Sequence, residues 1–298
     1  EIFASTGLKR VIVTNLVDLL PAWKRYLGVL FDKVPHGKIS RDDERIYSFR
    51  SLLKHEPRKL QAELDPWKDL SYILYTGGTT GFPKGVPGNH IGMTSYVHNV
   101  TEDVAGEYLK EGRDTYIAIN PLFHIMALGL LMAIGLNKGN ATVVMPIPQV
   151  DAILETVQRH RIRWMLGVPA LYRMILDNDR IDRYDLSALT YCICGGDVLP
   201  VEIFNRWKER FGVPIYQVYG STEVGHVCYS RIDKSPKPGT IGLPLGSRGC
   251  IIVDPATLDP VAVGESGELL VSSPYTMKGY WNKPEETDRT CVEIDGKT

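Results

Sequence analysis

Short apolar runs alternate with helical patterns through the middle of the chain, and this alternation constrains its fold more than any other feature. Five runs have the length and composition of buried strands, at residues 116–119, 141–145, 164–166, 191–194 and 215–218. Helical patterns lie between them. Strands that alternate with helices in this way pair mostly in parallel, with the helices on the faces of the sheet. We therefore predict an α/β fold with mostly parallel sheets flanked by helices.

The pattern changes after Glu223. Glycine and proline become frequent, helical periodicity disappears, and short β-like runs occur at residues 250–253 and 267–271. These features predict a small antiparallel, β-barrel-like region. We therefore divide the chain into a larger α/β domain, residues 1–234, and a smaller β-rich subdomain, residues 235–298.

Residues 75–86 read YTGGTTGFPKGV and follow an apolar run, residues 72–75, that is typical of a strand. Glycines let backbone N–H groups gather around an anion, threonines add hydroxyl donors, and the lysine adds a mobile positive charge. The spacing fits neither G-x-x-x-x-G-K-[ST] nor G-x-G-x-x-G. The segment therefore predicts a phosphate-binding loop of another type. Its candidate ligand residues are Thr76, Gly77, Gly78, Thr79, Thr80, Gly81 and Lys84.

Three further segments follow predicted strands, and they read PLFH (residues 121–124), GGDVLP (195–200) and YGSTE (219–223). Taken singly, they have simpler explanations: packing for the first, a capped helix start for the second and a solvated turn for the third. However, the carboxyl ends of parallel strands meet at one edge of a sheet, where ligands of such folds bind. There, Tyr219 would offer a face to a base, Thr222 a hydroxyl to phosphate, and Glu223 a carboxylate oxygen to Mg²⁺.

Together these segments resemble the adenylate-forming superfamily, which includes acyl-CoA synthetases, coumarate-CoA ligase-like enzymes, luciferases and peptide-synthetase adenylation domains. Five motifs occur in the order typical of that family. The fifth combines GELLV with GYWN within residues 267–282, and we interpret it as packing. One departure is Gly78, where serine is usual; this removes a hydroxyl but keeps the backbone donor. The resemblance spans about residues 69–287 and implies part of the family's large-domain fold.

The resemblance also implies a reaction and the residues that perform it. A carboxylate attacks the α-phosphate of Mg-ATP to give an acyl-adenylate and pyrophosphate, and coenzyme A then displaces AMP. The apolar run at residues 125–128 favours an acyl-CoA synthetase, an AMP-forming acid–thiol ligase, for a fatty or other apolar acid. The implied catalytic residues are Lys84, His124, Thr222 and Glu223, of which Glu223 also holds Mg²⁺. The implied ATP contacts are the loop residues above with Gly195, Gly196, Asp197, Tyr219, Gly220, Ser221 and Thr222.

Two alternatives remain open. An amino-acid-activating adenylation domain uses the same chemistry, but its pocket needs an acidic residue for the substrate amine, and Asp197 belongs to the glycine-rich segment instead. A nucleotide-binding module without catalysis is the other alternative, and the intact motifs argue against it.

Composition narrows the class of protein further. The formal net charge of −1 argues against the basic surface typical of nucleic-acid-binding proteins. No apolar run is long enough to span a bilayer, and the five cysteines predict free thiols. We expect a cytoplasmic enzyme whose partners are the acid, ATP and coenzyme A, and the sequence leaves a homo-oligomer open.

The chain starts without methionine and ends in a hairpin-like segment, which indicates a fragment. The family continues with a T-G-D element, a hinge and a small domain that carries a catalytic lysine. Because none of these follows here, we expect the isolated chain to be inactive in adenylation.

Overall fold

The computed structural model describes residues 6–15, 17–31, 44–59, 62–77, 82–145 and 148–294. The chain divides into two compact units, Glu1–Glu63 and Leu64–Thr298. The described elements of the first unit are β1 (Val11–Val13) and β2 (Ile46–Ser48), which pair in parallel, and the helices α1 (Ala22–Leu30) and α2 (Phe49–Leu52). The candidate site lies entirely in the second unit.

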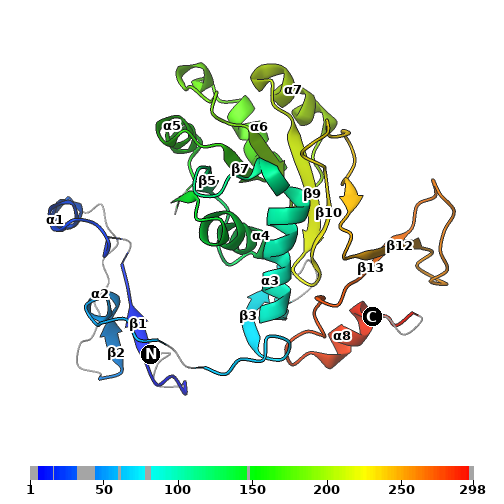
Figure 1. The fold of residues 1–298 in the computed structure, drawn as a ribbon, viewed down its shortest axis with the longest axis horizontal. Helices are drawn as coiled ribbons and strands as arrows, with labels where there is room; N and C mark the ends of the chain where they lie inside the picture. Colours follow the sequence, from blue (N-terminus) through cyan, green and yellow to red (C-terminus); the bar gives the residue numbers. More distant parts are fainter. Residues whose placement is uncertain are drawn as a thin grey trace. The chain divides into compact units, whose positions relative to one another are not determined.

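The second unit is built on a sheet of short strands. They are β5 (Thr115–Ala118), β6 (Ala141–Val144), β7 (Trp164–Gly167), β8 (Tyr191–Cys194), β9 (Ile215–Ser221), β10 (Gly225–Tyr229) and β11 (Leu243–Pro244). Across the described residues their order is β11-β10-β9-β8-β7-β5-β6. Figure 1 labels β5, β7, β9 and β10 of this sheet. Strands β5 to β9 pair in parallel, whereas β10 and β11 are antiparallel to their neighbours. The predicted α/β fold with a mostly parallel sheet is therefore confirmed.

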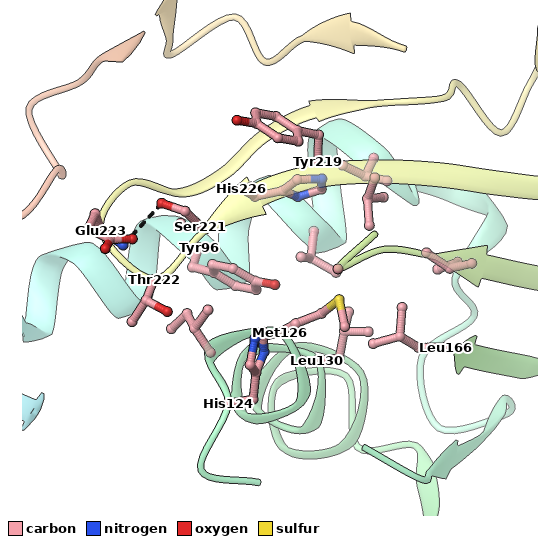
Figure 2. A pocket seen from close by; sticks show the side chains of 18 of the residues that line it. Tyr96, His124, Met126, Leu130, Leu166, Tyr219, Ser221, Thr222, Glu223 and His226 are labelled. Atoms are coloured by element: carbon pink, nitrogen blue, oxygen red, sulfur yellow. Dashed lines mark hydrogen bonds between the residues drawn. The ribbon is translucent and has the colours of Figure 1, made fainter. Parts of the chain in front are cut away.

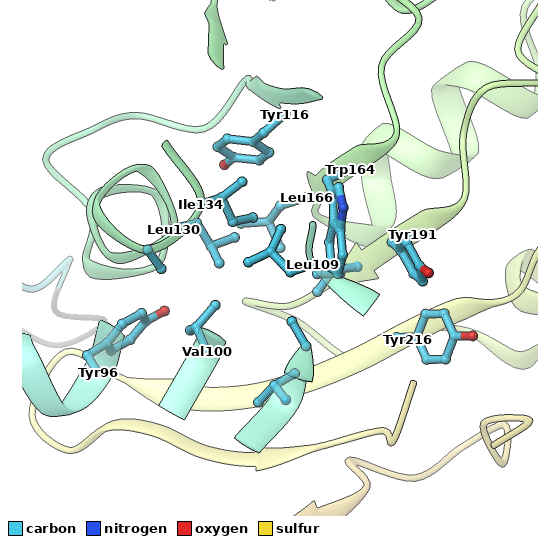
Figure 3. Packing of buried hydrophobic residues seen from close by; sticks show 14 of the residues in the cluster. Tyr96, Val100, Leu109, Tyr116, Leu130, Ile134, Trp164, Leu166, Tyr191 and Tyr216 are labelled. Atoms are coloured by element: carbon cyan, nitrogen blue, oxygen red, sulfur yellow. The ribbon is translucent and has the colours of Figure 1, made fainter. Parts of the chain in front are cut away.

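The helices that flank the sheet are α3 (His90–His98), α4 (Ile125–Leu130), α5 (Val150–His160), α6 (Pro169–Leu176) and α7 (Val201–Phe211). Because successive strand residues point to opposite faces, the sheet has two cores. Met165 packs in one core with residues of α5, α6 and α7. Its neighbours Trp164 and Leu166 lie in the other, with Tyr96 of α3 and Leu130 of α4 (Figure 3).

Two of these helices widen along their length. Helix α3 continues into the π-helical segment η2 (Asn99–Val104), and α4 continues into η4 (Leu131–Asn137). Short 3₁₀ turns, η3 (Gly106–Tyr108) and η5 (Ile181–Arg183), follow η2 and α6. The residues of α3, η2, α4 and η4 that face the sheet form one wall of the candidate site.

The phosphate loop lies at the end of a strand pair. β3 (Leu70–Tyr75) is antiparallel to β4 (Gly85–Asn89), and Tyr75 lies opposite Gly85. The Thr76 N–H donates to the carbonyl of Lys84 at 3.0 Å, so the two ends of the loop meet. The strand predicted at residues 72–75 is thus confirmed. Gly78, Thr79, Thr80 and Gly81 lie outside the described residues.

The last part of the chain contains β12 (Gly249–Val253), antiparallel to β13 (Glu268–Ser272), and the helix α8 (Pro284–Thr290). Both β-like runs predicted there are strands. Strand β11 joins the main sheet although it lies beyond residue 235, and the boundary after residue 234 stays a prediction. Among the helices that the structure describes, none combines the length and the hydropathy of a membrane span.

Candidate functional site

A cavity of about 310 Å³ lies between the helical wall and the carboxyl ends of the parallel strands. Figure 2 shows His124 and Met126 across this cavity from Tyr219 and His226. Its outer part, here called the polar rim, consists of Thr76, Gly77, His124, Gly196, Tyr219, Gly220, Ser221, Thr222 and Glu223. Its inner part, here called the interior, is lined by Tyr96, Val100, Val104, Ala105, Leu130, Ile134, Trp164, Leu166, Ile193 and His226. Nine residues of the predicted site thus line one cavity, together with Tyr75, which was not among the predicted site residues.

Three described residues of the predicted site do not line the cavity. Gly195 lies just behind the wall, because a Cβ added there would come within 3.0 Å of the Met126 sulfur. The Asp197 carboxylate accepts a hydrogen bond of 2.7 Å from the Val198 N–H, at the turn before α7. The Lys84 ammonium lies 4.3 Å from the centre of the Tyr280 ring. The ligand roles of these residues stay predictions.

A tight hairpin between β9 and β10 carries the acidic end of the polar rim. A Cβ on Gly220 would lie 2.2 Å from the carbonyl oxygen of Gly225, so only glycine fits this close approach. The Ser221 hydroxyl accepts a hydrogen bond of 3.2 Å from the N–H of Glu223 (Figure 2) and one of 3.4 Å from the N–H of Val224. These contacts place Thr222 and Glu223 at the tip of the hairpin, beside the mouth of the cavity.

His124 caps α4. Its Nδ1 accepts a hydrogen bond of 3.2 Å from the Met126 N–H, and burial lowers the pKa of the imidazole. In the neutral ring the hydrogen therefore sits on Nε2, which makes that nitrogen a donor. The residue can donate a hydrogen bond to an anionic ligand in the cavity without carrying a full charge.

The interior contains two polar side chains that the sequence did not indicate, Tyr96 and His226. Their ring centres are 6.1 Å apart. His226 is buried, and neither of its ring nitrogens makes a hydrogen bond of normal geometry with a described residue. Burial, reinforced by the positive charge of Arg248, lowers the pKa of His226 to about 4. No sequence signal marks His226, and it reaches the cavity because β10 pairs with β9 and places His226 opposite Gly220.

Comparison with known proteins agrees with the fold. The AMP-binding enzyme family matches residues 2–281. A long-chain-fatty-acid–CoA ligase of Bacillus subtilis is 33% identical over 93% of this chain and 50% of its own length. A feruloyl-CoA synthase of an Amycolatopsis species is 32% identical over 86% of this chain and 48% of its own. The chain thus spans about half the length of the curated relatives that it matches.

Solved structures give the same result. The ATP-bound RpMatB-BxBclM chimera B3 superposes with a TM-score of 0.72 at 26% identity, over 80% of this chain and 46% of that one. The anthranilate CoA ligase AuaEII, in complex with anthranoyl-AMP, has a TM-score of 0.77 over 97% of this chain and 57% of that one. Its 24% identity supports the fold alone. The family match and the shared fold confirm the resemblance that the motifs predicted, and the chain belongs to the AMP-binding enzyme family.

Proposed function

We propose that the protein activates a carboxylic acid with ATP through an acyl-adenylate and then transfers the acyl group to coenzyme A. One observation carries the proposal: a single cavity joins a polar rim of phosphate-binding character to an interior that is mostly apolar. The rim suits a nucleotide, and the interior suits the tail of an acid. Relatives that are named as CoA ligases support the same reaction.

The polar rim has free capacity for a nucleotide. Among the described residues, the buried hydroxyl of Thr76 has no hydrogen-bond partner, and none lies within 4 Å of a Cβ added at Gly77. The Tyr219 side chain is 40% exposed, so one ring face is available to adenine. We propose that Thr76, Gly77 and Lys84 hold the phosphates together with the predicted residues of the undescribed loop. Gly195, Gly196 and Asp197 would lie beside the base.

Glu223 is the proposed holder of Mg²⁺. No cluster of three or more histidine, cysteine or acidic side chains occurs among the described residues. A single carboxylate nevertheless suits Mg²⁺, which completes its shell with phosphate oxygens and water. The bound ion would neutralise charge on the phosphates.

The proposed chemistry needs no nucleophile from the protein. A carboxylate oxygen bonds to the α-phosphorus as the bond to pyrophosphate breaks. In the second step the sulfur of coenzyme A, after losing its proton, bonds to the acyl carbon as AMP leaves. Lys84, Thr222 and the loop amides would stabilise the charge that develops on phosphate, and His124 would donate to the reacting carboxylate.

The lining of the interior supports an apolar acid, fatty or aryl. Val100, Leu130, Ile134 and Leu166 supply most of its wall. Glu223 is the only carboxylate among the described residues that line the cavity, and it accepts a hydrogen bond from Tyr280. This arrangement does not favour an amino-acid substrate, whose amine would need an acidic partner. We also propose a cytoplasmic location for the protein.

The test uses the full-length protein with ATP, Mg²⁺, coenzyme A and a panel of aliphatic, aryl and amino acids. We expect AMP release that depends on an apolar acid, and the matching acyl-CoA in the mass spectrum. Aminoacyl hydroxamate formed in the presence of hydroxylamine would support the amino-acid alternative instead. ATP binding without turnover on any acid would refute the proposed reaction and support a binding module.

A further inference from the structure

Tyr280 lies between two charged side chains of the predicted phosphate site. Its hydroxyl donates a hydrogen bond of 2.8 Å to Oε1 of Glu223, and its ring faces the Lys84 ammonium at 4.3 Å. Only 7% of the residue is exposed. Neither Lys84 nor Glu223 forms an ion pair with any residue that the structure describes. Tyr280 thus contacts both Glu223 and Lys84, although these two charged side chains do not form an ion pair with each other.

The backbone around Tyr280 is attached to the same two hairpins. The Met277 N–H donates to the carbonyl of Glu223 at 2.9 Å, and the Trp281 N–H donates to the carbonyl of Gly85 at 2.8 Å. The Tyr280 N–H donates to the hydroxyl of Thr287 in α8, also at 2.9 Å. These three bonds fix the position from which the phenol reaches both charges.

Each contact with Tyr280 leaves part of the charged group free to bind a ligand. A hydrogen bond to Oε1 leaves Oε2 of Glu223 free to accept from or coordinate a cation. A cation held over an aromatic face keeps its three N–H donors available to an anion. Direct pairing of Lys84 with Glu223 would instead neutralise both groups before the nucleotide arrived.

We propose that Tyr280 is a positioning residue that orients Glu223 for the divalent cation and keeps Lys84 apart from it, ready for phosphate. This inference rests on the proposed function. It assigns a role to the GYWN segment, which the sequence indicated only as packing.

The experiment compares Tyr280→Phe and Tyr280→Leu in the full-length protein. The phenylalanine variant keeps the ring and loses the hydroxyl, so the Mg²⁺ concentration for half-maximal AMP formation should rise about tenfold, because a hydrogen bond to a charged group is lost. Saturating Mg²⁺ should restore its kcat. The leucine variant also loses the ring, so its KM for ATP should rise as well. Tyr275→Phe is the matched control, because Tyr275 lies in the same segment and stacks on Trp67 instead.

Calorimetric titration of ATP at several Mg²⁺ concentrations gives a second readout that does not depend on turnover. Tyr280→Phe should weaken binding at low Mg²⁺ and should add nothing to Glu223→Gln, since both changes act on one contact. A phenylalanine variant with unaltered Mg²⁺ dependence in both assays would overturn the role of Tyr280, even if its melting temperature fell. Wild-type protein that forms no AMP with any acid would overturn the proposed function instead, and the calorimetry would still decide the role of Tyr280.

Discussion

Replacing His226 with leucine is expected to remove a pH-dependent loss of stability. In the folded protein, burial and then the Arg248 charge lower the pKa of this imidazole from 6.5 to about 4. The unfolded chain therefore takes up a proton below pH 6.5 that the folded chain takes up only near pH 4. Since the unfolded state binds more protons in this range, the free energy of unfolding falls as the pH falls. Above the unfolded pKa the effect vanishes.

The size of the effect follows from the two pKa values. Integrating proton uptake gives a loss of about 2 kcal/mol between pH 7 and pH 5, and about 3 kcal/mol by pH 4. Leucine cannot take up this proton, and it removes two ring nitrogens that are buried without good partners. We therefore expect His226→Leu to match or exceed the wild-type stability at about pH 5.

Urea unfolding of both proteins at about pH 7 and about pH 5 measures the difference. Comparing the two pH-induced changes cancels the contribution of the carboxylates, which both proteins share. His98→Leu, at an exposed helical position, controls for the loss of a histidine in general. Equal losses of stability in wild type and His226→Leu would refute the assignment of a buried, neutral His226.

Two further substitutions test other parts of the site, and a third tests a buried ion pair outside it. Lys84→Met should lower kcat/KM for ATP at least about tenfold in a steady-state ATP titration, because the charge that we propose for binding phosphate is lost. An unchanged kcat/KM would show that Lys84 does not bind ATP. Val100→Phe narrows the interior and should lower kcat/KM for the longest accepted acid more than for the shortest, whereas an equal loss for all acids would contradict the assigned wall. Asp114→Ala should cost about 3 kcal/mol in urea unfolding, because the fully buried carboxylate accepts from Arg163 and from the Trp164 indole. A cost below about 1 kcal/mol would show that solvent compensates for the lost carboxylate.

Much of the sheet could be predicted because strand burial is a local pattern. Each predicted run alternates sides as it should: Trp164 and Leu166 face one core, and Met165 faces the other. The π-helical segments η2 and η4 could not be predicted, because no residue type in them marks a wider winding. Their wider winding depends on packing against the sheet, which no local pattern encodes.

The residues of the polar rim could be predicted from local sequence, whereas the polar side chains of the interior could not. The rim residues belong to contiguous motifs whose residue types indicate their chemistry directly, although Tyr75, which lines the same cavity, was not predicted. Tyr96 and His226 meet only because α3 and β10 pack together, and neither is unusual in its own segment. The contacts of Tyr280 likewise depend on a turn at Gly279, and a turn alone does not show which groups it brings together.

The helical wall has a consequence for how relatives of this protein could diverge. Val100 and Val104 reach the cavity from η2, where the winding holds more residues in each turn than an α-helix does. Deleting one residue there would shift the register of the following side chains, by less than the rotation of about 100° per residue of an α-helix. The hairpins that carry Thr76 and Glu223 are separate elements and would keep their backbone. A length change of one residue in either helix is therefore expected to alter the proposed acid pocket and to leave the backbone of the proposed ATP site unchanged.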